Sequence, residues 1–269
     1  VVDAELALPA PALPAPPGEA PEEEEPVVEG SSLLEGLGVF WNLNETSGTR
    51  FDAIGVTHLT TLAGTDQFGA GIIENALQSV SGTTFKVSGM TPTFLDGMVN
   101  ASFTVSYWVY FTATGGAGVS HGGVFTKGIG TLTIDNWDGE VQSRINFQRI
   151  EFTLRSNSGE NEGAQVSFRH SQTLATATWH FVVCWYDTSN GSLNIQVNNG
   201  TPESEVPFDP IGPHPSPTGP WTIGGNLAAS PLDLYGRVDA MGIWFRLLTT
   251  EERSTLWNGG AGLEWPFEL

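Results

Sequence analysis

The stretch Tyr235–Phe267 constrains the fold of this chain more than any other, because it combines a strand, a corner, a short helix and a glycine stop. Its first part, Gly236–Trp244, is rich in Val, Ile, Met and Trp, which favours a buried strand. Thr249 stands three residues before Glu252, which is the spacing of a capping box, and the sequence from Asn258 tolerates the positive φ at which helices end. So short a helix is marginal alone. We therefore expect it to pack on a sheet that contains Gly236–Trp244.

The composition extends this prediction to the whole chain. The 269 residues include 33 glycines, 17 prolines and nine tryptophans, a turn-rich composition typical of all-β proteins. Further strands are expected at Gly36–Leu43, Phe103–Phe111, Phe147–Ser156, Ala164–His170, Trp179–Asp187 and Ser192–Asn198, and loops at Asn44–Thr57, Gly115–Gly123 and Val206–Pro220. The predicted fold is an all-β, two-sheet antiparallel β-sandwich (a jelly roll) over residues 31–269, with one short C-terminal helix and an extended N-terminal arm.

Three segments carry a resemblance to known proteins. They are VFWNLNETSGTRFDAIGVTHL at Val39–Leu59, TWHFVVCWYDTSNGSLNIQVNN at Thr178–Asn199, and the pattern G-R-V-D-x-x-G-I-W-x-R-x-L-T-x-E-E that ends in W-N-G-G-A-G. In this order they resemble the opening, the central hairpin and the C-terminal signature of laminin-G-like, concanavalin A-like jelly-roll domains. The resemblance covers residues 36–267 and implies the jelly-roll fold. Lectins, adhesion modules, glycosidases and virion proteins share that fold, so function needs evidence of its own.

The charge of the chain excludes two classes of partner. Thirty acidic residues stand against ten basic ones, which gives a net charge of −20. Such a chain repels nucleic acid and anionic membranes. The longest apolar runs are strand-sized, so membrane insertion is not expected either. Cys184 is the single cysteine, so no intrachain disulfide forms, and we expect it to be a small buried hydrophobe.

Residues 1–30 differ in composition from the rest, with seven prolines, eight acids and no base. Such a segment buries too little apolar surface to fold alone, and composition favours a spacer or tether. The alternative hypothesis is an arm that docks on a protein partner in a larger assembly. Its contact residues would be Leu6, Leu8, Leu13, Glu22, Glu23, Glu24 and Glu25.

An enzymatic function is not predicted. Glycoside hydrolases on this fold place carboxylates at alternate positions of one strand, so that they face the same cleft. The nearest candidate here is Asp135, Asp138 and Glu140, whose spacing divides the carboxylates between two faces of a strand. The sequence also contains no nucleophile elbow, zinc spacing, P-loop or dinucleotide fingerprint.

A structural Ca²⁺ site is implied by the resemblance, at the point where the opening loop meets the final strand. The matching positions are Asp52 and Asp239. Alternation along the strand places Asp239 on one face with Met241 and Ile243, in apolar surroundings where a carboxylate needs a cation or several hydrogen bonds. Calcium accepts carboxylate and backbone oxygens in a flexible shell.

Two alternatives for Asp239 stay open. The carboxylate could pair with Arg50 or Arg237, or it could accept hydrogen bonds from loop amides. Either arrangement would satisfy a buried carboxylate without a metal.

Candidate glycan contacts are Trp137 and His121, which lie in polar, glycine-containing segments of the kind that present aromatic side chains to sugars. In a chain with nine tryptophans, a partly buried structural role for Trp137 is the alternative.

Three functional classes remain, and we favour the first. It is a non-catalytic structural or adhesion module on the surface of a larger assembly, such as a phage or virus particle, docked through residues 1–30, with glycan contact as an added role. The second is a glycan-binding adhesion module of a secreted or cell-surface bacterial protein, and the third is a carbohydrate-active enzyme. The first two place the protein outside the cell or on a virion surface.

Overall fold

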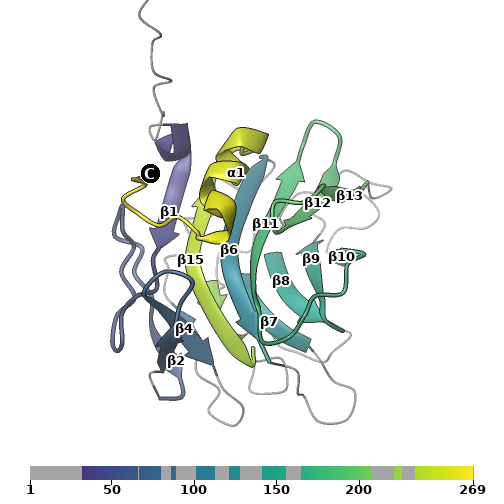
Figure 1. Ribbon diagram of the computed structural model, residues 1–269. Helices are drawn as coiled ribbons and strands as arrows, with labels where there is room; N and C mark the ends of the chain where they lie inside the picture. Colours follow the sequence, from purple (N-terminus) through teal and green to yellow (C-terminus); the bar gives the residue numbers. More distant parts are fainter. Residues whose placement is uncertain are drawn as a thin grey trace, which may run out of the picture.

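The computed structural model describes residues 32–65, 67–79, 86–88, 101–112, 121–127, 141–155, 165–206, 221–225 and 234–268. Its strands form two antiparallel sheets that pack face to face as a jelly-roll sandwich, with one short C-terminal helix (Figure 1). The predicted fold class is therefore confirmed. No helix in these ranges is long and apolar enough to cross a membrane.

The first sheet has eight strands in the described part of the chain. Seven follow the order β13-β12-β11-β6-β15-β4-β3, and β1 pairs with the free part of β15. The strands are β1 (Leu37–Trp41), β3 (Phe68–Ala70), β4 (Asn75–Ser79), β6 (Phe103–Phe111), β11 (Trp179–Asp187), β12 (Ser192–Val197), β13 (Glu203–Glu205) and β15 (Gly236–Trp244).

The second sheet has seven strands in the described ranges, in the order β10-β9-β8-β7-β14-β5-β2. The strands are β2 (Thr60–Ala63), β5 (Lys86–Ser88), β7 (His121–Lys127), β8 (Val141–Asn146), β9 (Arg149–Arg155), β10 (Gln165–Arg169) and β14 (Trp221–Ile223).

The inner faces of the two sheets enclose one apolar core. Stacked rings of Phe125 and Trp221, with centroids 5.0 Å apart, fill the centre on the side of the seven-stranded sheet. A buried hydrogen bond of 2.6 Å between the hydroxyls of Tyr107 in β6 and Ser143 in β8 links the two sheets. Cys184 is buried beside this pair, where burial raises the pKa of its thiol to about 12. The cysteine is thus the buried hydrophobe that the sequence predicts.

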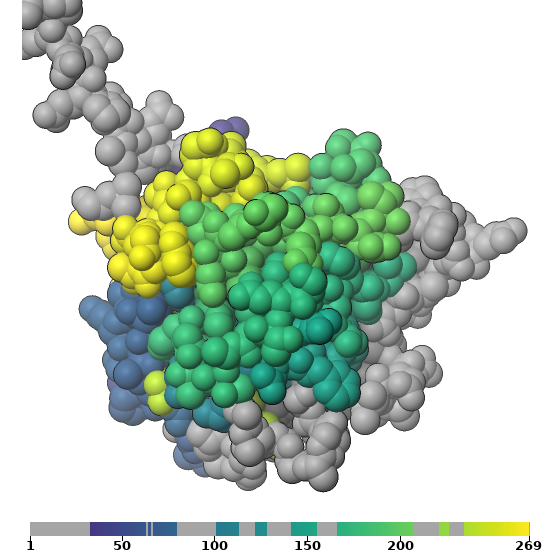
Figure 2. All heavy atoms as spheres, turned by 45° about the vertical axis from the view of Figure 1, so that its right-hand side comes forward, coloured from purple at the N-terminus to yellow at the C-terminus, as the bar shows by residue number. Residues whose placement is uncertain are grey.

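The outer face of the eight-stranded sheet carries a second apolar cluster, which helix α1 (Thr250–Trp257) and the C-terminal segment cover (Figures 1 and 2). Trp108 of β6 stacks on Trp257 of the helix with ring centroids 5.1 Å apart. The helix has the predicted capping box, in which Thr249 accepts from the Glu252 amide and Glu252 accepts from the Thr249 amide. The helix therefore closes one outer face of the sandwich against water.

Several predicted strands agree with the structure residue for residue, namely Phe103–Phe111, Trp179–Asp187 and Gly236–Trp244. Two predictions are wrong. The segment Gly115–Gly123 is expected to be a loop, yet its last three residues begin β7, where pairing with β8 outweighs the low strand propensity of glycine. The segment Phe147–Ser156 is expected to be one strand, yet Phe147 lies in the turn between β8 and β9.

Candidate functional site

Asp52 lies in the loop that follows β1, and its carboxylate organises that loop. One oxygen accepts from the amides of Phe40 (3.4 Å) and Ile54 (3.2 Å), and the other accepts from the amide of Thr57 (3.1 Å). The residue is buried. Amides of the loop and of the adjoining strand β1 thus donate hydrogen bonds to both carboxylate oxygens of Asp52.

Asp239 lies on β15, but on the opposite face from the one predicted. It pairs with Trp108, whose ring belongs to the outer cluster, whereas Met241 and Ile243 belong to the core between the sheets. One extra residue of β15 is inserted between Asp239 and Gly242, so the alternation changes face at this bulge. The expectation that Asp239 shares a face with Met241 and Ile243 is therefore wrong, although its burial is confirmed.

The carboxylate of Asp239 accepts hydrogen bonds from loop amides, as one of the two alternatives proposes. Oδ2 accepts from the amides of Ile72 (2.8 Å) and Ile73 (3.2 Å). Oδ1 is buried and has no hydrogen-bond partner within the part of the chain that the structure describes. The nearby Arg237 donates instead to Gln78 and to the carbonyl of Ala70. One oxygen of a fully buried carboxylate is thus left without a donor, which is costly.

Other oxygens converge on the same place. A Cβ at Gly71 would lie 2.5 Å from the carbonyl oxygen of Ile73 and 2.6 Å from that of Asn75, and would also overlap Oδ2 of Asp239. The position therefore requires glycine, and it brings two carbonyl oxygens and a carboxylate around one small space. Burial raises the pKa of Asp239 to about 7, against the effect of the backbone amides of Ile73, Ile72 and Ala240, and the charge of Glu264 adds to the rise.

Glu264, in the C-terminal segment, completes this acidic group. Its Oε2 accepts from the side-chain amide of Asn44 at 2.9 Å, and Asn44 also accepts from the amide of Asn75. Burial raises the pKa of Glu264, and the charge of Glu74 raises it further. Asp52 and Asp239 share no hydrogen-bond partner, and no group of three acidic, histidine or cysteine side chains suited to a metal occurs in the described residues.

A second polar site, which the sequence interpretation missed, lies on the outer face of the seven-stranded sheet. Glu151 of β9 is 2 % exposed, and Arg144 of β8 and Arg169 of β10 both ion-pair with it. Arg169 donates to Oε2 through Nε (3.0 Å) and Nη2 (2.8 Å), Arg144 donates to Oε1 through the same two nitrogens, and Asn146 donates to Oε2 at 2.5 Å. Burial acts to raise the pKa of Glu151, but these partners together lower it.

The rest of this outer face is polar as well. Apolar side chains of β8, β9 and β10 join the core, and the residues that alternate with them point outward. Two of the outward acceptors, Oε1 of Gln142 and Oδ1 of Asn146, are buried without a hydrogen-bond partner in the described ranges. The outward residues with described side chains include Thr126, Gln142, Arg144, Asn146, Arg149, Glu151, Thr153, Ser167, Arg169 and Thr222. The alternation of Arg149–Arg155 (RIEFTLR) is the sequence signal that could have located this face.

An exposed aromatic side chain stands at the end of this face. The turn between β8 and β9 consists of Phe147 (φ 49°) and Gln148 (φ 60°), and 55 % of Phe147 is exposed. A tight hairpin turn needs positive φ at both central residues, for which Asn-Gly is the least strained choice. A phenylalanine at such a position is a backbone outlier of the kind that occurs at functional sites.

The described residues include only one of the two predicted glycan contacts, His121. His121 is the first residue of β7, which corrects its expected place in a loop, and it pairs with Asn146 of β8. Trp137 and the rejected catalytic group of Asp135, Asp138 and Glu140 lie outside the described residues. Residues 1–30, with every predicted contact residue of the arm, lie outside them too.

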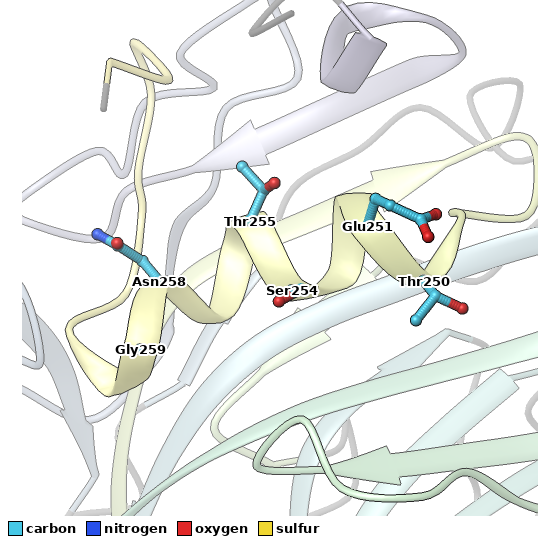
Figure 3. A pocket seen from close by; sticks show the side chains of 6 residues that line it. All are labelled: Thr250, Glu251, Ser254, Thr255, Asn258 and Gly259. Atoms are coloured by element: carbon cyan, nitrogen blue, oxygen red, sulfur yellow. The ribbon is translucent and has the colours of Figure 1, made fainter. Parts of the chain in front are cut away.

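A shallow depression lies on the exposed side of α1 (Figure 3). Thr250, Glu251, Ser254, Thr255, Asn258 and Gly259 line it. The side chains in Figure 3 follow the helix and do not converge on a common point. This surface therefore offers no cluster of polar groups that could orient a ligand.

Comparison with known proteins supports the fold. The family model described as Laminin_G_3, of the concanavalin A-like lectin/glucanases superfamily, matches residues 87–252, which is more than half of the chain. A search of curated proteins gives no significant match.

Solved structures share this fold at low sequence identity. The binding domain of Paraclostridial Mosquitocidal Protein 1 has a TM-score of 0.62 and 12 % identity, over 84 % of this chain and 52 % of that one. Domain 4 of AbnA, a GH43 extracellular arabinanase from Geobacillus stearothermophilus, solved with arabinotriose, has a TM-score of 0.57 and 14 % identity, over 84 % and 98 %. Botulinum neurotoxin type C, whose cell entry depends on interaction with two ganglioside molecules, has a TM-score of 0.58 and 13 % identity, over 85 % and 52 %. The chain thus spans about half of the two toxin chains and nearly all of the arabinanase domain.

The raised pKa of Asp239 predicts a pH-dependent stability in metal-free buffer. The native state holds this proton more tightly than the unfolded chain, whose aspartate has the ordinary value of 3.8. This contribution to the free energy of unfolding is present below about pH 4 and is lost as the pH rises through about 7. In Asp239→Asn the contribution is absent, so wild type should lose stability relative to the variant between pH 4 and 8. The relative loss should be on the order of a few kcal/mol, since a tenfold change in proton affinity is about 1.4 kcal/mol.

Urea unfolding of both proteins in EDTA at several pH values measures this difference. Parallel stability curves for wild type and Asp239→Asn would contradict a raised pKa at this carboxyl.

Proposed function

Because the chain belongs to the concanavalin A-like lectin/glucanase superfamily, we propose that it is a non-catalytic, glycan-binding module that acts outside the cell. Its glycan site is the polar outer face of the seven-stranded sheet, which we call the polar face. The arabinanase domain solved with arabinotriose and the neurotoxin that interacts with gangliosides support this class of function through their shared fold.

The difference between the two outer faces carries the proposal. The outer face of the eight-stranded sheet is apolar and closed by α1. The polar face instead combines the exposed guanidinium of Arg169, which Glu151 holds in place, with the exposed aromatic ring of Phe147. Sugars need this combination, because hydroxyls exchange hydrogen bonds with oriented polar groups while the C–H side of a sugar ring packs on an aromatic face.

Replacement of Phe147 should separate glycan binding from folding. Phe147→Ala should weaken binding to the best glycan ligands of the wild type by about tenfold, as expected for the loss of an aromatic anchor. The melting temperature should not fall, because the ring is 55 % exposed and alanine keeps the same chain length in the turn. Glycan-array screening of the wild type followed by calorimetry of the variant measures the effect.

Phe51→Ala is the matched control, because Phe51 is also 55 % exposed but lies in the loop after β1, away from this hairpin. Equal losses in the two variants would contradict a specific role for Phe147. Failure of the wild type to bind any glycan would overturn the proposed function.

We also propose that a structural Ca²⁺ binds at Asp239. Oδ1 of this residue lacks a partner among the described residues, the carbonyl oxygens of Ile73 and Asn75 lie beside Oδ2 of the same carboxylate, and the charge of Glu264 is nearby. These oxygens fit the mixed carboxylate and carbonyl shell that calcium prefers. Such an ion would neutralise the buried charge of Asp239 and tie the Gly71–Asn75 loop to β15. The pairing of Asp52 with Asp239 in one site remains a proposal without a shared contact to support it.

Chelation tests the cation and identifies its ligands. EDTA should lower the melting temperature of the wild type, since a ligand at a hundred times its Kd stabilises the native state by about 2.7 kcal/mol. Asp239→Asn should abolish the EDTA effect. Asp52→Asn should keep it if the loop carbonyls complete the site, and should lose it if Asp52 is a ligand. An identical wild-type melt in Ca²⁺ and in EDTA would eliminate the site.

The finer proposal concerns display on a larger assembly, with a phage or virus particle as the favoured example. It rests on the composition of residues 1–30, whose prolines reduce the entropy lost on docking and whose run of four glutamates suits a basic partner surface. Adhesion from a secreted or cell-surface protein is the alternative context, and it uses the same glycan site.

Deletion of residues 1–30 should leave the melting temperature nearly unchanged, because the described strands form their core without this segment. It should abolish incorporation into the assembly, and high salt should weaken incorporation of the full chain because exposed charge pairs are screened. Cosedimentation of tagged protein with native particles measures both effects. Incorporation of the truncated chain at full occupancy would refute the docking role.

A further inference from the structure

Half of the basic residues of this acidic chain lie on strands that form the polar face. Five of the ten lysines and arginines lie on four consecutive strands, β7 to β10, which together carry one acidic residue, Glu151. The five are Lys127, Arg144, Arg149, Arg155 and Arg169. In a chain with a net charge of −20, these strands form a local positive region.

The ion-pair network leaves one positive charge in excess. Glu151 neutralises one of its two arginine partners, and both guanidinium groups use Nε and Nη2 to bind it. The Nη1 group of each arginine is not part of this network. The side chain of Arg169 is 40 % exposed, whereas that of Arg144 is 13 % exposed. Arg169 is therefore the guanidinium that a ligand can reach, and Glu151 holds it in a fixed orientation.

The groups around Arg169 indicate which other chemical features the ligand has. The acceptors of Gln142 and Asn146 lie beneath the surface, so Ser167 and Arg169 are the exposed polar side chains on the described parts of β8 to β10. Phe147 provides an apolar surface at the end of the same hairpin. A guanidinium recognises a planar carboxylate through parallel N–H donors, more specifically than it recognises a neutral hydroxyl.

We propose that the polar face selects glycans that carry a carboxylate, with Arg169 as the residue that binds it and Phe147 as a contact to the sugar. This inference rests on the proposed glycan-binding function and adds the ligand class. A uronic acid and a sialic acid both present the required group. A densely charged polyanion is excluded by repulsion from the rest of the chain, so the carboxylates are few in an otherwise neutral glycan.

The test compares each acidic glycan with its carboxyl-reduced form, in which –COO⁻ becomes –CH₂OH and the rest is unchanged. Two arms, one with uronic acid glycans and one with sialylated glycans, identify the source of the carboxylate. Wild type should bind the acidic form of one series about tenfold more tightly than its reduced form, the size expected for a charge-assisted hydrogen-bond pair. Arg169→Ala should remove this preference while retaining binding to the reduced form.

Two further variants make the result specific. Arg169→Lys keeps the charge but loses the planar donor pair, so it should recover only part of the preference. Arg237→Ala removes an arginine of the other sheet and should leave the preference intact. Arg169→Ala should fold, because Glu151 keeps Arg144 and Asn146 as partners, and its melting temperature checks this.

The outcomes distinguish the inference from the function on which it rests. Equal binding of acidic and reduced glycans by wild type would overturn the inference and leave glycan binding intact. A preference that survives in Arg169→Ala would overturn the role of Arg169. Absence of binding to every glycan would overturn the proposed function and the inference together.

Discussion

Strand β15 connects the parts of this fold, and the extra residue within it decides what each face presents. It pairs with β6 over most of its length, with β4 up to Val238, and with β1 from Met241 onward. The bulge between Asp239 and Gly242 lies where the partner on one edge changes from β4 to β1. A strand that exchanges partners must bend and twist there, and a bulge allows this without loss of the flanking ladders.

The bulge has consequences for both packing and chemistry. It directs Met241 and Ile243 into the core and leaves Asp239 and Trp244 on the outer side. Trp244 then lies in the cluster under α1, where its indole N–H donates to the carbonyl of Leu33 at 2.8 Å. Asp239 is buried on the same side, next to the loop that contains Gly71. One inserted residue thus places the carboxylate of Asp239 at the edge of an apolar cluster. There burial and the charge of Glu264 raise its pKa, and the neighbouring backbone amides lower it.

The sequence predicted those parts of the fold whose signals are local. Strong alternation located β6 and β11, and the spacing of Thr249 and Glu252 located the start of α1. The turn at Phe147 was missed because neither of its residues is a usual turn former, so its positive φ values come from the ladder on either side. The face of Asp239 was wrong because alternation assumes an unbroken strand, and nothing in the residues around Ala240 marks the insertion. The network around Glu151 joins side chains of three strands. The sequence alone does not show that these side chains are neighbours, because that depends on the order of the strands in the sheet.

The charges of the chain and of the polar face act on an anionic ligand at different distances. At physiological ionic strength exposed charges are screened beyond about 8 Å, so the negative surface influences approach more than final contact. At contact the ligand meets Arg169, whose orientation is fixed by a buried carboxylate that two other side chains also satisfy. Every charge of a long polyanion would be repelled by the negative surface of the chain. A glycan with one carboxylate would have a single repelled charge and would still make its full contact with Arg169. The same electrostatics that disfavour nucleic acid therefore favour a sparsely charged sugar at this face.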